Sequence, residues 1–127
     1  MPRVMVFGTF DLLHPGHEFV LSEAVKRGDV TVIIARDENV KHIKGKFPTE
    51  NETVRKEAVE KKFPSARVIL GDPENFLTPV RAEKPDLILL GYDQRMPPGV
   101  TEADLGCKIE RLPPHEPERY KTSLRKG

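Results

Sequence analysis

The stretch Gly8-Thr9-Phe10-Asp11-Leu12-Leu13-His14-Pro15-Gly16-His17 decides the fold of this chain. It follows an apolar run over residues 4–7 and precedes a helical pattern that begins at His17. The pattern predicts a turn from a buried strand into a helix. The first N–H groups of such a helix lack partners, and the helix dipole adds partial positive charge, so the turn favours an anion. Gly16 lets a phosphate approach the main chain, and His14 and His17 can donate to its oxygens as neutral or charged rings.

The histidine pair is open to two other interpretations. One is a surface turn with incidental histidines, because short motifs often match by chance. The other is a zinc site. The ligand count disfavours zinc, since Cys107 is the only cysteine and no second ligand pair lies nearby in sequence. The position between a strand and a helix favours a phosphate site, because βα units bind phosphate there.

The composition is that of one globular domain. The chain has 127 residues, 37% hydrophobic and 32% charged, and a formal net charge of +1. This near-neutral charge gives no global field that would attract nucleic acid. No apolar run reaches the length of a membrane span, and one cysteine forms no internal disulfide. We therefore expect a single domain over residues 1–127, no nucleic-acid or membrane partner, and a cytoplasmic location.

Apolar runs alternate with helical patterns along the chain. The expected strands cover residues 3–7, 29–35, 66–70, 86–90 and 107–112. The expected helices cover residues 17–27, a segment after Thr49, and residues 74–83 and 102–105. This alternation predicts an α/β fold, a single doubly wound, Rossmann-like three-layer domain with a five-stranded parallel sheet. Neither GxGxxG nor a P-loop is present, which disfavours a dinucleotide oxidoreductase and a P-loop kinase.

Two further segments stand out. Residues 40–48, VKHIKGKFP, are basic and contain a glycine, and we expect a loop there, by composition a solvated one. In the helix that follows, Thr49 and Glu52 fit a capping box. The spacing of Arg55 from Ala58 and Val59 points it partly toward the body of the protein, where a purely solvating arginine is less usual. Residues 92–94 follow the fourth strand, at the edge where open α/β sheets bind ligands.

The segment GTFDLLHPGH strongly resembles the signature of the cytidylyltransferase-like nucleotidyltransferases. The resemblance extends over nearly the whole chain. Residues 44–46, KGK, resemble the family's basic loop, and residues 91–94, GYDQ, resemble its glycine–acid segment near the base and ribose. Residues 119–123, RYKTS, stand where the family carries a second signature. The segments ARDENVK and LGYDQ look most like archaeal-type FAD synthases.

The resemblance implies a set of site residues. Those expected to carry catalysis are His14, His17, Lys44 and Arg55. Those expected to contact the nucleotide are Gly8, Thr9, Phe10, His14, Pro15, Gly16, His17, Asp93, Arg119, Tyr120, Thr122 and Ser123. Those expected to contact the acceptor are Asp11, Lys44, Lys46 and Arg55. Asp11 is also open to a metal-binding or a structural role, as an acid that accepts from main-chain N–H groups.

The implied activity joins a nucleoside monophosphate from an NTP to a phosphate-bearing acceptor and releases pyrophosphate. An acceptor phosphate is already a nucleophile, so catalysis rests on positioning and on neutralising charge, with Mg²⁺ or another divalent cation. FMN adenylyltransferase is favoured, and glycerol-3-phosphate cytidylyltransferase is the alternative. The resemblance also implies a homodimer.

Two hypotheses without chemistry remain. A nucleotide-binding sensor would keep the pocket alone, but the combination of both histidines, both lysines and Arg55 argues against it. An RNA-binding domain would use the basic loop, but the near-neutral charge and the lack of an aromatic platform argue against it.

Overall fold

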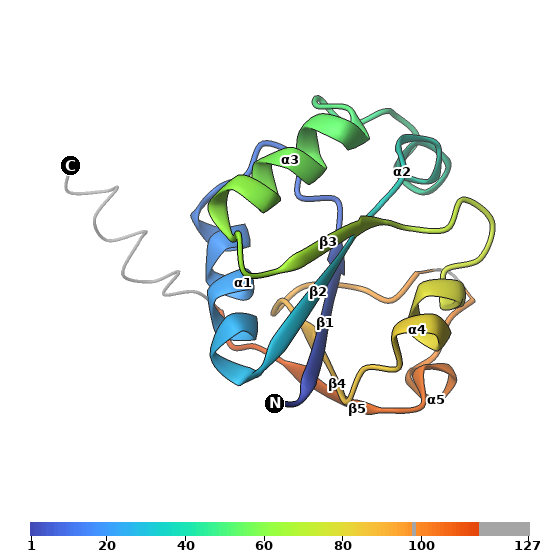
Figure 1. Ribbon diagram of the computed structural model, residues 1–127. Helices are drawn as coiled ribbons and strands as arrows, with labels where there is room; N and C mark the ends of the chain where they lie inside the picture. Colours follow the sequence, from blue (N-terminus) through green and yellow to red (C-terminus); the bar gives the residue numbers. More distant parts are fainter. Residues whose placement is uncertain (98, 115–127) are drawn as a thin grey trace.

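Five parallel strands form one sheet in the computed structural model, which describes residues 1–97 and 99–114 (Figure 1). The strand order is β3-β2-β1-β4-β5. The strands are β1 (Arg3–Gly8), β2 (Asp29–Ile34), β3 (Arg67–Leu70), β4 (Leu87–Leu90) and β5 (Lys108–Arg111). The helices are α1 (Pro15–Arg27), α2 (Asp37–Lys44), α3 (Glu52–Lys62), α4 (Leu77–Glu83) and α5 (Glu102–Leu105). The predicted α/β class and five-stranded parallel sheet are confirmed.

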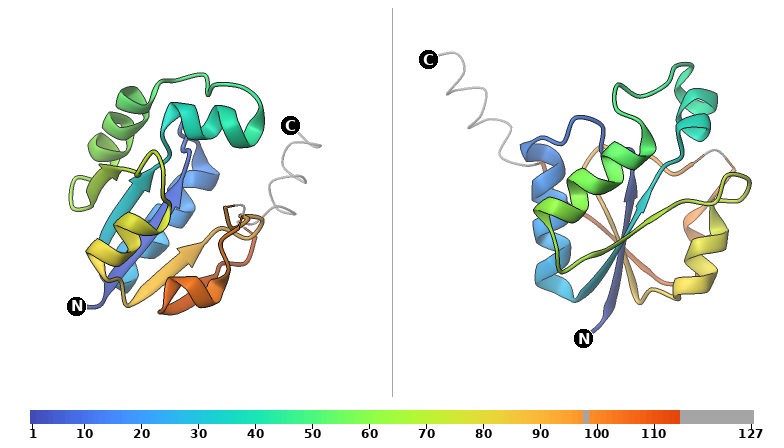
Figure 2. Two further views of the ribbon diagram at one scale, coloured as in Figure 1. Left: turned by 90° about the vertical axis from the view of Figure 1, so that its right-hand side faces the viewer. Right: turned by 45° about the horizontal axis from the view of Figure 1, so that its top comes forward.

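Helices cover both faces of the sheet (Figures 1 and 2). α1 and α3 pack on one face, and α4 and α5 lie on the other. Successive side chains of β1 divide between the two cores: Val4 and Val6 belong to the first, Met5 and Phe7 to the second. Because both faces are buried, the strand is a continuous apolar run rather than an alternating one.

The direction of winding reverses between β1 and β4. From β1 the chain passes to β2 and β3 on one side, and α4 then carries it back to β4 on the other side. β1 forms six registered pairs with β2 but only two with β4, Val4 with Leu87 and Met5 with Ile88. Beyond these pairs, the carboxyl ends of β1 and β4 flank the crevice where doubly wound sheets bind ligands.

α2 is the main correction to the sequence-based prediction, which assigned residues 40–48 to a loop. Acidic residues begin this helix and basic residues end it, which complements the helix dipole. Gly45 closes it in the left-handed conformation, with φ of 84°, and donates to the Lys41 carbonyl at 2.7 Å. Val40 is its only buried residue, so the apolar pattern was too short to reveal a helix.

The predicted capping box of α3 is wrong. Asn51 caps this helix, and its side-chain oxygen accepts from the Val54 N–H at 2.9 Å. The Glu52 carboxylate instead accepts from the Asp37 N–H at 2.8 Å. The main-chain N–H of Thr49 donates to Asp11 at 2.8 Å. Thr49 therefore joins a tertiary contact rather than a local cap.

Element boundaries moved by a few residues elsewhere. α1 begins at Pro15 rather than at His17, and α4 begins at Leu77 because the Asp72 carboxylate holds the N–H groups of residues 74 and 75 in a turn. Within the described ranges, no helix combines the length and the apolar composition that a bilayer crossing needs.

Candidate active site

A cavity of about 930 Å³ lies over the carboxyl ends of the strands. Residues that follow each of the five strands contribute to its lining. Of the predicted site residues, those that line it are Gly8, Thr9, Phe10, Asp11, His14, Gly16, His17, Lys44 and Asp93. The structure thus brings most of the predicted site together at the edge where ligands bind in this class of sheet.

The two histidines cap α1 reciprocally. The Gly16 N–H donates to His14 Nδ1 at 3.1 Å, and the His14 N–H donates to His17 Nδ1 at 3.4 Å. The rings stack, with centroids 3.7 Å apart and planes 22° apart. Because both Nδ1 atoms accept, each neutral ring carries its proton on Nε2. The Nε2–H groups are therefore the donors that these rings can offer to a ligand.

His17 is a neutral donor at pH 7. Burial lowers its pKa from 6.5 to about 4, with smaller electrostatic contributions from the neighbouring His14 and Lys44, although Asp11 opposes the shift. The sequence allowed neutral or charged rings, and the structure selects the neutral form for His17. Its ring also meets the edge of Phe10, with centroids 5.4 Å apart.

The turn itself has an unusual backbone. Phe10 and Leu12 adopt left-handed backbone conformations with φ of 53° and 50°, which residues other than glycine rarely adopt. Phe10 is buried in the core beneath α1, and a Cβ on Gly8 would come within 3.1 Å of its ring. Gly8 and Phe10 thus fix the base of the turn, in addition to lining the cavity. Their predicted contacts with nucleotide stay predictions.

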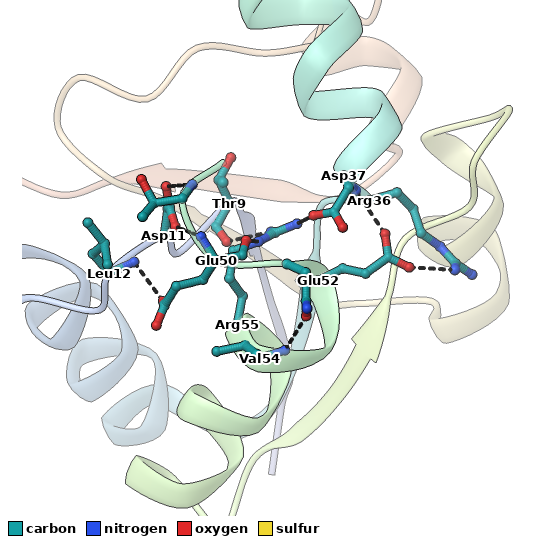
Figure 3. A network of polar contacts seen from close by, with 11 residues as sticks. Thr9, Asp11, Leu12, Arg36, Asp37, Glu50, Glu52, Val54 and Arg55 are labelled. Atoms are coloured by element: carbon teal, nitrogen blue, oxygen red, sulfur yellow. Dashed lines mark hydrogen bonds and ion pairs between the residues drawn. The ribbon is translucent and has the colours of Figure 1, made fainter. Parts of the chain in front are cut away.

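Asp11 ties the turn to the segment before α3 (Figure 3). Its carboxylate accepts from the N–H groups of Thr49 at 2.8 Å and Glu50 at 2.9 Å, and the Glu50 carboxylate accepts from the Leu12 N–H at 3.0 Å. Burial raises the pKa of Asp11, but the two N–H donors and the charge of Arg55 outweigh it, and the pKa lies below 3.8. The geometry gives Asp11 a structural role, with partners from another loop rather than its own turn.

Arg55 lies beneath the turn and not in the cavity (Figure 3). Its side chain is 0% exposed. Its three nitrogens donate to the Glu50 carbonyl at 2.9 Å, the Thr9 carbonyl at 2.8 Å and the Asp37 carboxylate at 2.7 Å. The predicted direct contact of Arg55 with substrate therefore has no support in this geometry. The side chain joins the turn to the starts of α2 and α3.

A second pair of charges extends this network. Glu52 accepts from the Asp37 N–H and, at 3.2 Å, from Arg36, whose Nε donates to the Gly71 carbonyl at 2.8 Å. We call one side of the cavity the first wall. It consists of residues 8–17 and of the side chains that support them, which are Arg36, Asp37, Glu50, Glu52 and Arg55.

The basic residues after β2 separate in the structure. Lys44, the last residue of α2, lines the cavity, whereas Lys46 is exposed and outside the lining. Pro15 is the first residue of α1, a position that suits its fixed φ, and it too lies outside the lining. Lys46 and Pro15 thus stay predictions without geometric support.

The opposite side of the cavity, here the second wall, is formed by residues 91–97 after β4. Tyr92 and Asp93 are exposed and line the cavity. Gln94 Nε2 donates to the Phe7 carbonyl at 2.6 Å, and Gln94 Oε1 accepts from the Gly91 N–H at 3.1 Å. The amide thus bridges β1 and β4 where their ladder has ended.

Arg111, at the end of β5, supports the second wall. Its Nη1 donates to the carbonyls of Gln94 at 2.7 Å, Gly91 at 2.9 Å and Tyr92 at 3.3 Å. The sequence analysis missed Arg111 and the bridging role of Gln94. Proximity to Asp93 could have indicated Gln94, but no local pattern indicates an arginine on another strand.

Four predicted site residues lie outside the described residues: Arg119, Tyr120, Thr122 and Ser123. In the part of the chain that the structure describes, no group of three or more His, Cys, Asp or Glu side chains could hold a metal ion.

Comparisons with known proteins identify the family of the chain. The family model described as cytidylyltransferase-like matches residues 5–113. A FAD synthase of Aciduliprofundum boonei is 46% identical over 96 residues, which cover 75% of this chain and 64% of that protein. A FAD synthase of Methanosarcina mazei is 43% identical over 119 residues, covering 89% and 78%. The chain thus spans less than two thirds of the first of these relatives.

A solved structure shares the fold. The lipopolysaccharide core biosynthesis protein of Thermoplasma volcanium GSS1 superposes with a TM-score of 0.80 at 33% identity. The superposition covers 91% of this chain and 99% of that one.

Proposed function

Because the chain belongs to the cytidylyltransferase-like family, we propose that it transfers a nucleotidyl group, with ATP as donor and FMN as acceptor, to give FAD and pyrophosphate. The observation that carries this proposal is the histidine turn. Two Nε2–H donors and the amino end of α1 meet Lys44 at one cavity, beside the reversal of the sheet. The likeness to archaeal FAD synthases supports the choice of substrates.

The reaction needs no nucleophile from the protein. An oxygen of the FMN phosphate attacks the α-phosphorus of ATP, the bond to the bridging oxygen of the β-phosphate breaks, and pyrophosphate leaves with that electron pair. Negative charge develops on the phosphate oxygens. His14 and His17 would stabilise it as hydrogen-bond donors, and Lys44 as a cation. A single donor of this kind contributes about 3–4 kcal/mol to the barrier in other enzymes.

Arg55 would act indirectly, through the backbone of the turn. Its bond to the Thr9 carbonyl and its ion pair with Asp37 fix the backbone that presents the histidines. We therefore propose Arg55 as a positioning residue rather than a contact of the acceptor phosphate.

A divalent cation would arrive with the triphosphate. Mg²⁺ keeps several waters and is usually bound by one or two carboxylates together with substrate phosphates. Asp11 uses both oxygens on main-chain N–H groups, so the ion would be held mainly by the triphosphate and water. When bound, the ion would neutralise charge on the phosphates.

Pyrophosphate release tests the proposal. The protein is given each NTP with FMN or glycerol 3-phosphate over a range of Mg²⁺ concentrations. We expect release with ATP and FMN, and loss of turnover with little loss of stability in His17→Ala. His42→Ala is the matched control, because His42 is an exposed histidine of α2 outside the cavity lining. Failure of every pair would reject nucleotidyl transfer, whereas activity with CTP and glycerol 3-phosphate alone would change only the substrates.

The partners stay proposals too. We propose a homodimer, no nucleic-acid partner and a cytoplasmic location, as expected from the sequence. Light scattering at assay concentration tests the dimer, and a monomer would contradict it.

A further inference from the structure

The second wall depends on a bridge across a gap in the sheet. β1 and β4 share only two registered pairs, so the Phe7 carbonyl and the Gly91 N–H lie beyond the end of their ladder. The Gln94 amide bonds to both, and the Gln94 N–H donates to the Gly91 carbonyl at 3.2 Å. Residues 91–94 therefore form a closed turn that projects Tyr92 and Asp93 to the cavity.

Arg111 holds this turn from the side of β5. Three carbonyl oxygens of the turn converge on a single nitrogen, Nη1. Arg111 pairs with Leu90, the last residue of β4, so the residues that follow β4 pass beside its side chain. The guanidinium thus fixes the peptide planes on both sides of Tyr92 without lining the cavity itself.

Among the described residues, these carbonyls are the hydrogen-bond partners of the Arg111 guanidinium. Arg27, Arg36, Arg55 and Arg67 each pair with a carboxylate, whereas within residues 1–97 and 99–114 no carboxylate pairs with Arg111. A cation whose partners among the described residues are all backbone oxygens of one turn stabilises that turn rather than an ion-pair network.

The geometry points to Arg111 as a positioning residue for the nucleotide. It sets the conformation of residues 91–94, which present Tyr92 and Asp93 to the base and ribose. This inference rests on the proposed function, since it assigns the second wall to the ATP nucleoside and the first wall to its phosphates.

The test compares Arg111→Ala and Arg111→Lys with Arg67→Ala. Arg67 is the matched control because it is an exposed arginine of the other edge strand, β3, and donates to Glu83 away from the cavity. Binding of ATP with Mg²⁺ is measured by calorimetry without acceptor, and KM is measured for ATP and for FMN.

We expect Arg111→Ala to weaken ATP binding and raise the KM for ATP about tenfold, with the KM for FMN and kcat within about twofold, since uniform binding is lost. Arg111→Lys should recover most of the loss, because an ammonium also donates to several carbonyls. Arg67→Ala should match the wild type.

Unchanged ATP binding in Arg111→Ala would overturn the inference. So would a parallel loss of ATP and FMN affinity with a lower melting temperature, or a Lys variant no better than Ala. If the wild type binds ATP but makes no FAD, the proposed function fails. The calorimetric comparison of ATP binding by the wild type and Arg111→Ala still tests the role of Arg111.

Discussion

The two walls of the cavity are held by arginines in opposite ways. In the first wall, Arg55 is fully buried and pairs with Asp37, and the carboxylates around it bond to main-chain N–H groups (Figure 3). Arg111, which supports the second wall, is exposed, and its hydrogen-bond partners among residues 1–97 and 99–114 are all carbonyls. Buried charges must keep every partner, whereas exposed ones exchange partners for water.

This difference separates two kinds of tolerance. The network that supports the histidine turn is tied to global stability, so substitutions of Asp11 or Arg55 should destabilise the fold before they alter substrate affinity. The wall of residues 91–97 is tied more weakly, so substitutions there should change affinity while the fold persists. Four variants test this contrast, and they follow in order from the largest expected effect to the smallest.

Arg55→Met should be the most damaging. It leaves the Asp37 carboxylate and two carbonyls without their donor, and breaking a buried pair in this way costs about 3–5 kcal/mol. Urea unfolding measures the change. Arg67→Met, which removes an exposed ion pair, should stay within about 0.5 kcal/mol of the wild type. Equal stability of the two variants would remove the distinction between the walls.

Asp11→Asn should destabilise the protein by about 1.5–3 kcal/mol at pH 7, the value of hydrogen bonds to a charged group. Because the folded pKa of Asp11 is lowered, its contribution is complete above 3.8 and is lost as the pH falls below that value. The gap between variant and wild type in urea unfolding should therefore close in acid. Asp29→Asn is the control, because this exposed carboxylate makes no side-chain hydrogen bond within the described residues, and a comparable loss there would contradict the assignment.

Gln94→Leu should cost about 1 kcal/mol, because the Phe7 carbonyl and Gly91 N–H lose partners in a half-buried setting. The effect on ATP affinity should be larger than the effect on stability. Gln94→Glu checks the orientation of the amide: a carboxylate oxygen facing the Phe7 carbonyl should be worse than Leu. A Glu variant as stable as the wild type would show that no donor is needed there.

His17 should give the smallest change, and it depends on pH. Its pKa is about 4 in the folded protein and 6.5 when unperturbed, so the unfolded chain binds more protons between these values. Stability should therefore rise with pH from about 4 to 6.5, and His17→Gln should lose that part of the rise. Urea midpoints across this range measure it, and identical slopes would mean that the His17 ring titrates normally.

The sheet and the histidine turn were predictable because their signals are local. Four of the five strands lie in short apolar runs, whereas β5 has a weaker pattern, and the turn carries its own glycines, its proline and both histidines within ten residues. α2 was not predictable in this way, since one buried residue, Val40, gives no periodicity. Thr49 looked like a cap by spacing, but Asn51 stands closer to the first turn of α3 and satisfies it.

The roles of individual charges needed the tertiary structure. The sequence indicated that Arg55 points partly toward the body of the protein. It did not indicate that the guanidinium donates to the Thr9 carbonyl and the Asp37 carboxylate. Asp11 was left between three roles because its partners lie 38 and 39 positions away. Arg111 was invisible because its function follows from the pairing of β5 with β4.

The central place of β1 also sets an order of assembly. Residues up to 70 can pair β1 with β2 and β2 with β3, and the contacts of Arg55, Asp11 and Glu50 all fall within this part. During synthesis from the amino end, these groups emerge before β4 and β5 exist. The histidine turn can thus reach its final shape on a nascent half-sheet of three strands. The turn after β4 takes its final shape only after Arg111 of β5, the last strand, has been synthesised.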